Sequence, residues 1–113
     1  RSFTYVDDLV DGLLLVTEKH AAAEALNICT KETHTIKDVV RILLDYLEFH
    51  PKVIFSTDKP SLIPYKVSDP GRARELLGWE AKVSLEEGLR RTVDWYIEQS
   101  RSLRQASPVG AIE

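Results

Sequence analysis

The chain has 113 residues, the size of one domain, and 43% of them are hydrophobic, which permits a buried core. Fifteen Lys and Arg residues stand against eighteen Asp and Glu, and the resulting net charge of −3 argues against a nucleic-acid partner. The single cysteine, Cys29, excludes an internal disulfide framework and suits a reducing, cytoplasmic compartment. No run of residues approaches the roughly 20 apolar positions of a membrane span, so no membrane partner is expected.

The first half of the chain alternates predicted strands with predicted helices. The order is strand, helix, strand and helix, over residues 1–5, 7–19, 25–29 and 35–49. Asp7 and Asp8 lie where a helix dipole favours negative charge. Thr35 and Asp38 resemble a capping box, so a helix is expected to follow them.

The second half predicts two more strands and then two helices. These cover residues 52–56, 63–67, 70–77 and 85–103. Asp69 is placed to cap the third helix with Pro70 at its first position, and Gly78 is its expected stop. Ser84 and Glu87 form a second capping box before the longest helix.

The predicted fold class is therefore α/β: a small lobe of short strands and about four helices. The lobe covers residues 1–104, and residues 105–113 lack any periodicity and are expected to be a flexible tail. The absence of methionine and the strand-like opening lead us to expect a piece of a longer protein.

The residues predict no self-contained catalytic or metal site. The three histidines are 14 and 16 residues apart, which matches no metal-ligand spacing. The five glycines are scattered and form no phosphate loop. A carboxylate site at Asp7, Asp8 and Asp11 is disfavoured, because acidic residues at a helix start more often form a solvated face.

Four motifs in register carry a more specific signal over about residues 1–100. They read RSFTYVDDL at residues 1–9, LNI at 26–28, RARELLGW at 72–79, and SLEEGL with TVDWY at 84–96. Together they resemble the extended short-chain dehydrogenase/reductase family of NAD(P)-dependent nucleotide-sugar epimerases, dehydratases and reductases.

The resemblance implies the C-terminal, substrate-binding lobe of a Rossmann-based two-lobe enzyme. The family's glycine-rich NAD(P) loop and Tyr-x-x-x-Lys motif are not in this sequence. No cofactor is therefore expected in this chain itself, and NAD or NADP is expected in the parent protein. The implied partners are an NDP-sugar and the missing Rossmann half, and the surface exposed by its loss can drive self-association.

The same resemblance supplies candidate substrate-binding residues. Arg1 corresponds to the family's arginine that contacts the diphosphate, a role that suits the forked guanidinium. Lys59 stands where a second arginine is usual, and Tyr65 and Lys66 stand where some members touch the nucleotide. Leu62 replaces an acid that often contacts the nucleoside.

Alternatives stay open from the sequence. The Lys59-Pro60 pair is similar to that of GDP-fucose-synthase-like members, which favours a reductase/epimerase lobe of that kind. Lys59 and Leu62 also fit a non-catalytic interaction module derived from the fold. On the first two interpretations the parent protein is the enzyme, and this chain alone has no activity.

Overall fold

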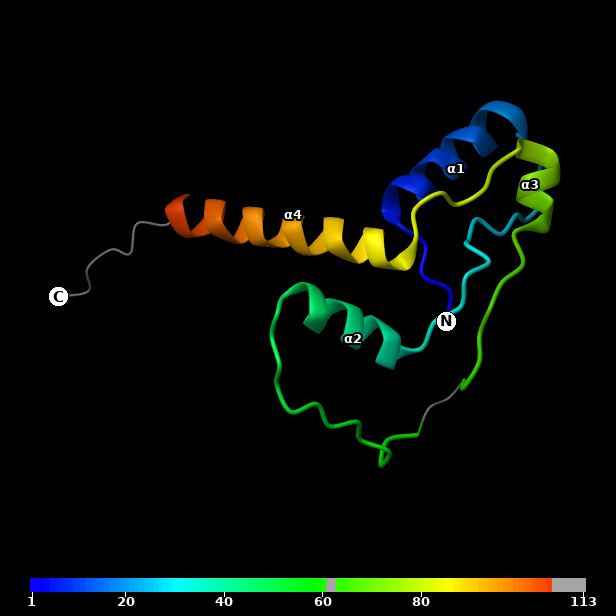
Figure 1. The fold of residues 1–113 in the computed structure, drawn as a ribbon. Coiled ribbons are helices and arrows are strands. Elements are labelled where there is room, and N and C mark those ends of the chain that lie inside the picture. Colours follow the sequence, from blue (N-terminus) through cyan, green and yellow to red (C-terminus); the bar gives the residue numbers. More distant parts are fainter. Residues whose placement is uncertain (61–62, 107–113) are drawn as a thin grey trace.

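The computed structural model describes residues 1–60 and 63–106 (Figure 1). Within them the chain forms four helices: α1 (Val6–Lys19), α2 (Ile36–Tyr46), α3 (Gly71–Leu77) and α4 (Leu85–Ala106). The four predicted helices are confirmed. Helix α4 continues three residues beyond its expected end and takes in the first two residues of the predicted tail. Residues 107–113 of that tail lie outside the described part.

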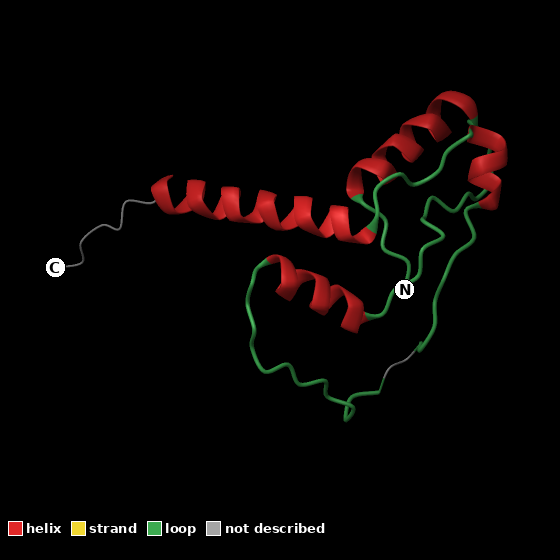
Figure 2. Cartoon of the chain, viewed as in Figure 1, coloured by secondary structure: helices red, strands yellow, loops and turns green. Residues whose placement is uncertain are grey.

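The α/β prediction is wrong, because the described residues contain no strand and no sheet (Figure 2). The predicted strands are extended or irregular connections between helices. Arg1 and His34 exchange both backbone hydrogen bonds, each at 2.9 Å, but the pairing does not continue as a ladder. Alternating side chains indicate a strand only when a neighbouring strand completes the ladder, and no described segment does so.

Local sequence signals locate the helix ends. Thr35 and Asp38 form the complete capping box, each side chain bonding the other's backbone N–H. Gly78 ends α3 in the left-handed conformation, with a φ of 66°. The cap of α3 differs by one residue from the prediction: Pro70 occupies the N-cap position, while Asp69 Oδ1 accepts the Gly71 N–H at 2.9 Å.

A clasp between α1 and the segment after α3 forms the centre of the fold. Asp8 is only 5% exposed, and its Oδ2 accepts the backbone N–H groups of Lys82 at 3.0 Å and Val83 at 2.9 Å. The buried indole of Trp79 donates to the carbonyl of Asp8 at 3.0 Å. We call these three hydrogen bonds the Asp8 clasp. They correct the sequence-based interpretation of Asp8 as part of a solvated acidic face.

The clasp depends on a close approach of α1 to its neighbours. A Cβ on Gly12 would stand 2.5 Å from Ile28 Cγ2 and 3.1 Å from Trp79 Nε1, so only glycine fits there without displacement. Around this contact lies a core cluster of Ala73, Leu77 and Trp79. Leu15 and Val16 of α1 pack against this cluster, so the core joins segments that are far apart in the sequence.

The buried core is small for a chain of this length. The radius of gyration is 18.9 Å, against about 13 Å for a compact domain of 100 residues. Many large apolar side chains remain exposed, including Ile54 at 77% and Leu103 at 70%. Helices α1 and α3 lie side by side, as do α2 and α4, and α4 extends past α2 (Figure 1). No helix of the described residues is long and apolar enough to cross a membrane.

We predict that Asp8→Ala lowers the free energy of unfolding by about 1–3 kcal/mol, because two partly buried N–H groups lose their acceptor. Urea unfolding of the protein measures the change. Asp11→Ala is the matched control: Asp11 is exposed on the same helix, and its removal should cost less than about 0.5 kcal/mol. Equal effects of the two substitutions would contradict the clasp.

Candidate functional site

A hollow of about 310 Å³ lies beside the N-terminus of α2, and we call it the Arg1 hollow. Its lining comes from three separated parts of the chain: Arg1, residues 33–36 with Asp38, and residues 63–65. Two of the four predicted substrate-binding residues, Arg1 and Tyr65, meet here. The site therefore depends on the approach of the first residue to two later connections.

Arg1 is fixed by its backbone and by one end of its side chain. Its backbone exchanges two hydrogen bonds with His34, and its Nη2 donates to the carbonyl of Ile63 at 2.7 Å. Among the described residues Arg1 forms no ion pair with a carboxylate. An exposed guanidinium with uncommitted N–H groups is suited to an anionic group such as a phosphate.

The wall opposite Arg1 is the first turn of α2. Asp38 lines the hollow, but its Oδ2 accepts from the Thr35 backbone N–H and hydroxyl, both at 2.8 Å. These hydrogen bonds, the backbone one foremost, hold the pKa of the Asp38 carboxyl below its ordinary value. The Asp38 carboxylate therefore stays negatively charged at the hollow, where it caps α2 and pairs with Arg41 at 3.5 Å.

The other predicted site residues lie differently. Tyr65 is 73% exposed and presents an aromatic surface at the hollow. Lys59 and Lys66 are exposed and do not line it. Leu62 lies outside the described residues. The structure therefore brings together Arg1 and Tyr65 and leaves the two lysines on the surrounding connection.

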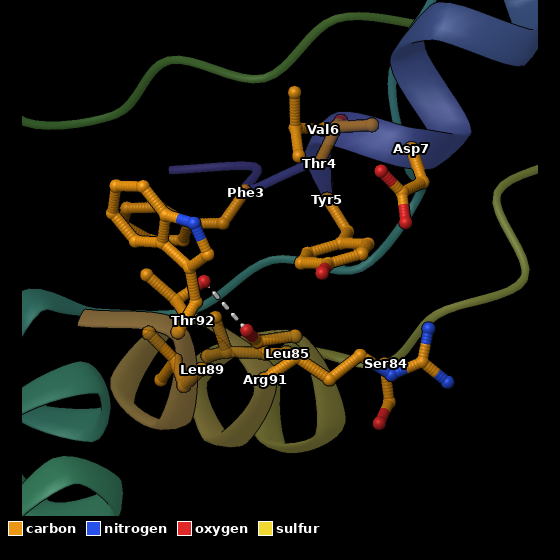
Figure 3. A pocket seen from close by; sticks show the side chains of 12 residues that line it. Phe3, Thr4, Tyr5, Val6, Asp7, Ser84, Leu85, Leu89, Arg91 and Thr92 are labelled. Atoms are coloured by element: carbon orange, nitrogen blue, oxygen red, sulfur yellow. Dashed lines mark hydrogen bonds between the residues drawn. The ribbon is translucent and has the colours of Figure 1, made fainter. Parts of the chain in front are cut away.

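A larger and more apolar hollow of about 630 Å³ lies between residues 3–7 and the first three turns of α4 (Figure 3). We call it the Tyr5 hollow. The side chains of Phe3, Leu85 and Leu89 face it (Figure 3), and Trp95, which is 60% exposed, also lines it. The sequence analysis did not predict this hollow, although the apolar residues at helical spacing in α4 could have indicated it. Its chemistry is that of an uncovered packing surface.

Cys29 has no features of a nucleophile. It is half-buried, and its thiol donates to the carbonyl of Ser68 at 3.4 Å. Burial, with a smaller contribution from the negative charge of Asp69, raises the pKa of the thiol above its ordinary value. Within the described part of the chain, no three acidic, histidine or cysteine side chains are grouped to hold a metal ion.

Comparison with known proteins identifies the class. The rice protein "Probable GDP-L-fucose synthase 1" is 31% identical over 105 residues, which cover 93% of this chain and 32% of that protein. The UDP-glucose 4-epimerase of Thermotoga maritima, solved with UDP-glucose, superposes with a TM-score of 0.81 at 33% identity, over 88% of this chain and 32% of that one. A UDP-glucuronic acid 4-epimerase of Bacillus cereus, solved with a substrate analogue and NAD, gives a TM-score of 0.77 at 30% identity, over the same two shares.

The family model described as GDP-mannose 4,6-dehydratase matches residues 1–92. These relatives are nucleotide-sugar epimerases, dehydratases and synthases of the short-chain dehydrogenase/reductase type. The chain therefore belongs to the GDP-mannose 4,6-dehydratase family within that group. It spans about a third of the length of the relatives it matches.

We predict that Cys29 of the folded protein is alkylated by iodoacetamide with a pH midpoint above that of the same protein unfolded in urea. The raised pKa means that the folded state holds the thiol proton more tightly. The stability that this difference contributes is present below the unfolded thiol's pKa and is lost as the pH rises above it. A folded-state midpoint at or below the unfolded one would show that burial does not control this thiol.

Proposed function

We propose that this chain is the substrate-binding lobe of an NAD(P)-dependent nucleotide-sugar epimerase or dehydratase. In this proposal the Arg1 hollow holds the diphosphate of an NDP-sugar. A Rossmann half outside this chain binds NAD or NADP and carries out hydride transfer. The lobe contributes orientation of the sugar rather than bond making.

The observation that carries the proposal is the exposed Arg1 guanidinium in a hollow beside the aromatic ring of Tyr65. A positive, forked group next to an exposed ring matches the chemistry of a nucleoside diphosphate, whose phosphates accept hydrogen bonds and whose base can stack. Lys66 follows Tyr65 and Lys59 lies on the same connection, and both are exposed outside the lining of the hollow.

The exposed apolar surface supports the idea of a lobe. A chain with an expanded shape and an uncovered apolar hollow of about 630 Å³ leaves much apolar area in water, which another structural element stabilises by covering it. In the proposal the Rossmann half covers the Tyr5 hollow. Self-association through this surface is the expected behaviour when that half is absent.

Two solved relatives support the cofactor and the substrate class that we propose for the protein containing this chain. The Bacillus cereus epimerase was solved with NAD and a UDP-sugar analogue, and a Bordetella bronchiseptica enzyme of the same fold was solved with NAD⁺ and UDP. By analogy, a UDP- or GDP-sugar is the substrate class that we propose for the protein containing this chain. The cytoplasm is its proposed location, where such substrates and NAD(P) coexist.

A GDP-fucose-synthase-like reductase/epimerase is the second candidate, and two observations favour it. The sequence carries the Lys59-Pro60 pair, and the rice relative at 31% identity is named as a probable enzyme of that kind. A third candidate, a non-catalytic interaction module, differs from both in having no affinity for a nucleoside diphosphate.

We predict that the full-length protein binds UDP or GDP and that Arg1→Ala weakens this binding about 10- to 100-fold. The basis is that a hydrogen bond to a charged group contributes roughly 1.5–3 kcal/mol. Calorimetric titration of both nucleotides measures the affinities and shows which base is preferred.

Arg104→Ala is the matched control, because Arg104 is an exposed arginine near the end of α4 that does not line the Arg1 hollow. Its affinity should stay within about twofold of the unmodified protein. An unmodified protein that binds neither nucleotide would favour the interaction module. Equal losses from Arg1→Ala and Arg104→Ala would refute the assignment of the site to the Arg1 hollow.

A further inference from the structure

The N-terminal end of α2 forms one wall of the Arg1 hollow. His34, Thr35, Ile36 and Asp38 all line it, and His34 also holds the backbone of Arg1. Any shift of α2 along or across its axis therefore moves the wall and the anchor of Arg1 together. The hollow therefore keeps its shape only while this helix stays in place.

Helix α2 has little buried surface to hold it in the position that the Arg1 hollow requires. None of its eleven residues is buried, and α4 is the one helix against which it packs within the described residues (Figure 1). A long connection follows it, from residue 47 to the start of α3, and the described residues of that connection form no helix. Burial of apolar area therefore gives little assurance of a single position for α2.

A polar contact at the other end of α2 supplies the missing constraint. The hydroxyl of Tyr46, the last residue of the helix, donates to Asp94 Oδ1 of α4 at 2.6 Å. The guanidinium of Arg90, one turn earlier in α4, lies 5.2 Å from the centre of the Tyr46 ring. We call this contact the Tyr46 latch. It joins the C-terminal end of α2 to α4.

We propose that Tyr46 is a positioning residue for the Arg1 hollow: the latch sets α2 on α4 and so keeps the first turn of α2 in place for an anionic ligand. The two ends are about 16 Å apart along the helix, at 1.5 Å per residue, and an unbroken α-helix transmits the constraint as a rigid rod. The inference rests on the function proposed above, because it concerns the ligand of that same hollow.

The test compares nucleoside diphosphate affinities in the full-length protein by calorimetry, with UDP and GDP as probes. Tyr46→Phe removes only the hydroxyl, and Asp94→Ala removes its acceptor. Both should weaken binding about three- to tenfold, since the binding-competent position of α2 becomes one of several. Asp94→Asn keeps an acceptor oxygen and should bind within about twofold of the unmodified protein.

Tyr96→Phe is the matched control, because Tyr96 lies on α4, is 66% exposed and donates no hydrogen bond to the described residues. Titrations are run well below each variant's unfolding midpoint, so that a merely structural loss of stability does not change the affinity. Unchanged affinity of Tyr46→Phe, in a protein that binds the probe, would overturn the positioning role alone. An unmodified protein that binds neither probe would overturn the proposed function, and this inference with it.

Discussion

The carboxylate of Asp8 joins parts of the chain that are 74 and 75 positions apart, and the rest of the fold depends on that connection. It accepts two backbone N–H groups that would otherwise lack an acceptor, while Trp79 donates its indole N–H to the carbonyl of the same residue. A small apolar cluster surrounds the clasp, and Gly12 allows the close approach. In a chain with so little buried area, a few satisfied polar contacts decide the geometry.

The clasp places the first residues where they serve the candidate site. Residues 1–5 lead directly into α1, so fixing the start of that helix also fixes where Arg1 lies. From there Arg1 reaches His34 and Ile63, which come from two different connections. The Arg1 hollow is thus assembled from segments distant in the sequence: the first residue, the start of α2 and residues 63–65.

The sequence predicted the helices well because their signals are local. The Thr35 and Asp38 box and the stop at Gly78 need only neighbouring residues, and both are present. The strands failed because a ladder needs a second strand, which alternation along residues 1–5 or 63–67 cannot reveal. The family resemblance predicted four substrate-binding residues. Arg1 and Tyr65 line the hollow, whereas Lys59 and Lys66 do not. The buried role of Asp8 and the Tyr46 latch depend on tertiary contacts, so composition and periodicity carry no signal for them.

In the proposed two-lobe enzyme, an NDP-sugar is held by its diphosphate at the Arg1 hollow. A crystal structure of the full-length protein with a bound nucleoside diphosphate tests this most directly. We expect phosphate oxygens within hydrogen-bond distance of the Arg1 guanidinium and the base beside Tyr65. We also expect another part of the protein to cover the Tyr5 hollow. A nucleotide bound elsewhere, with Arg1 facing solvent and the Tyr5 hollow uncovered, would contradict it.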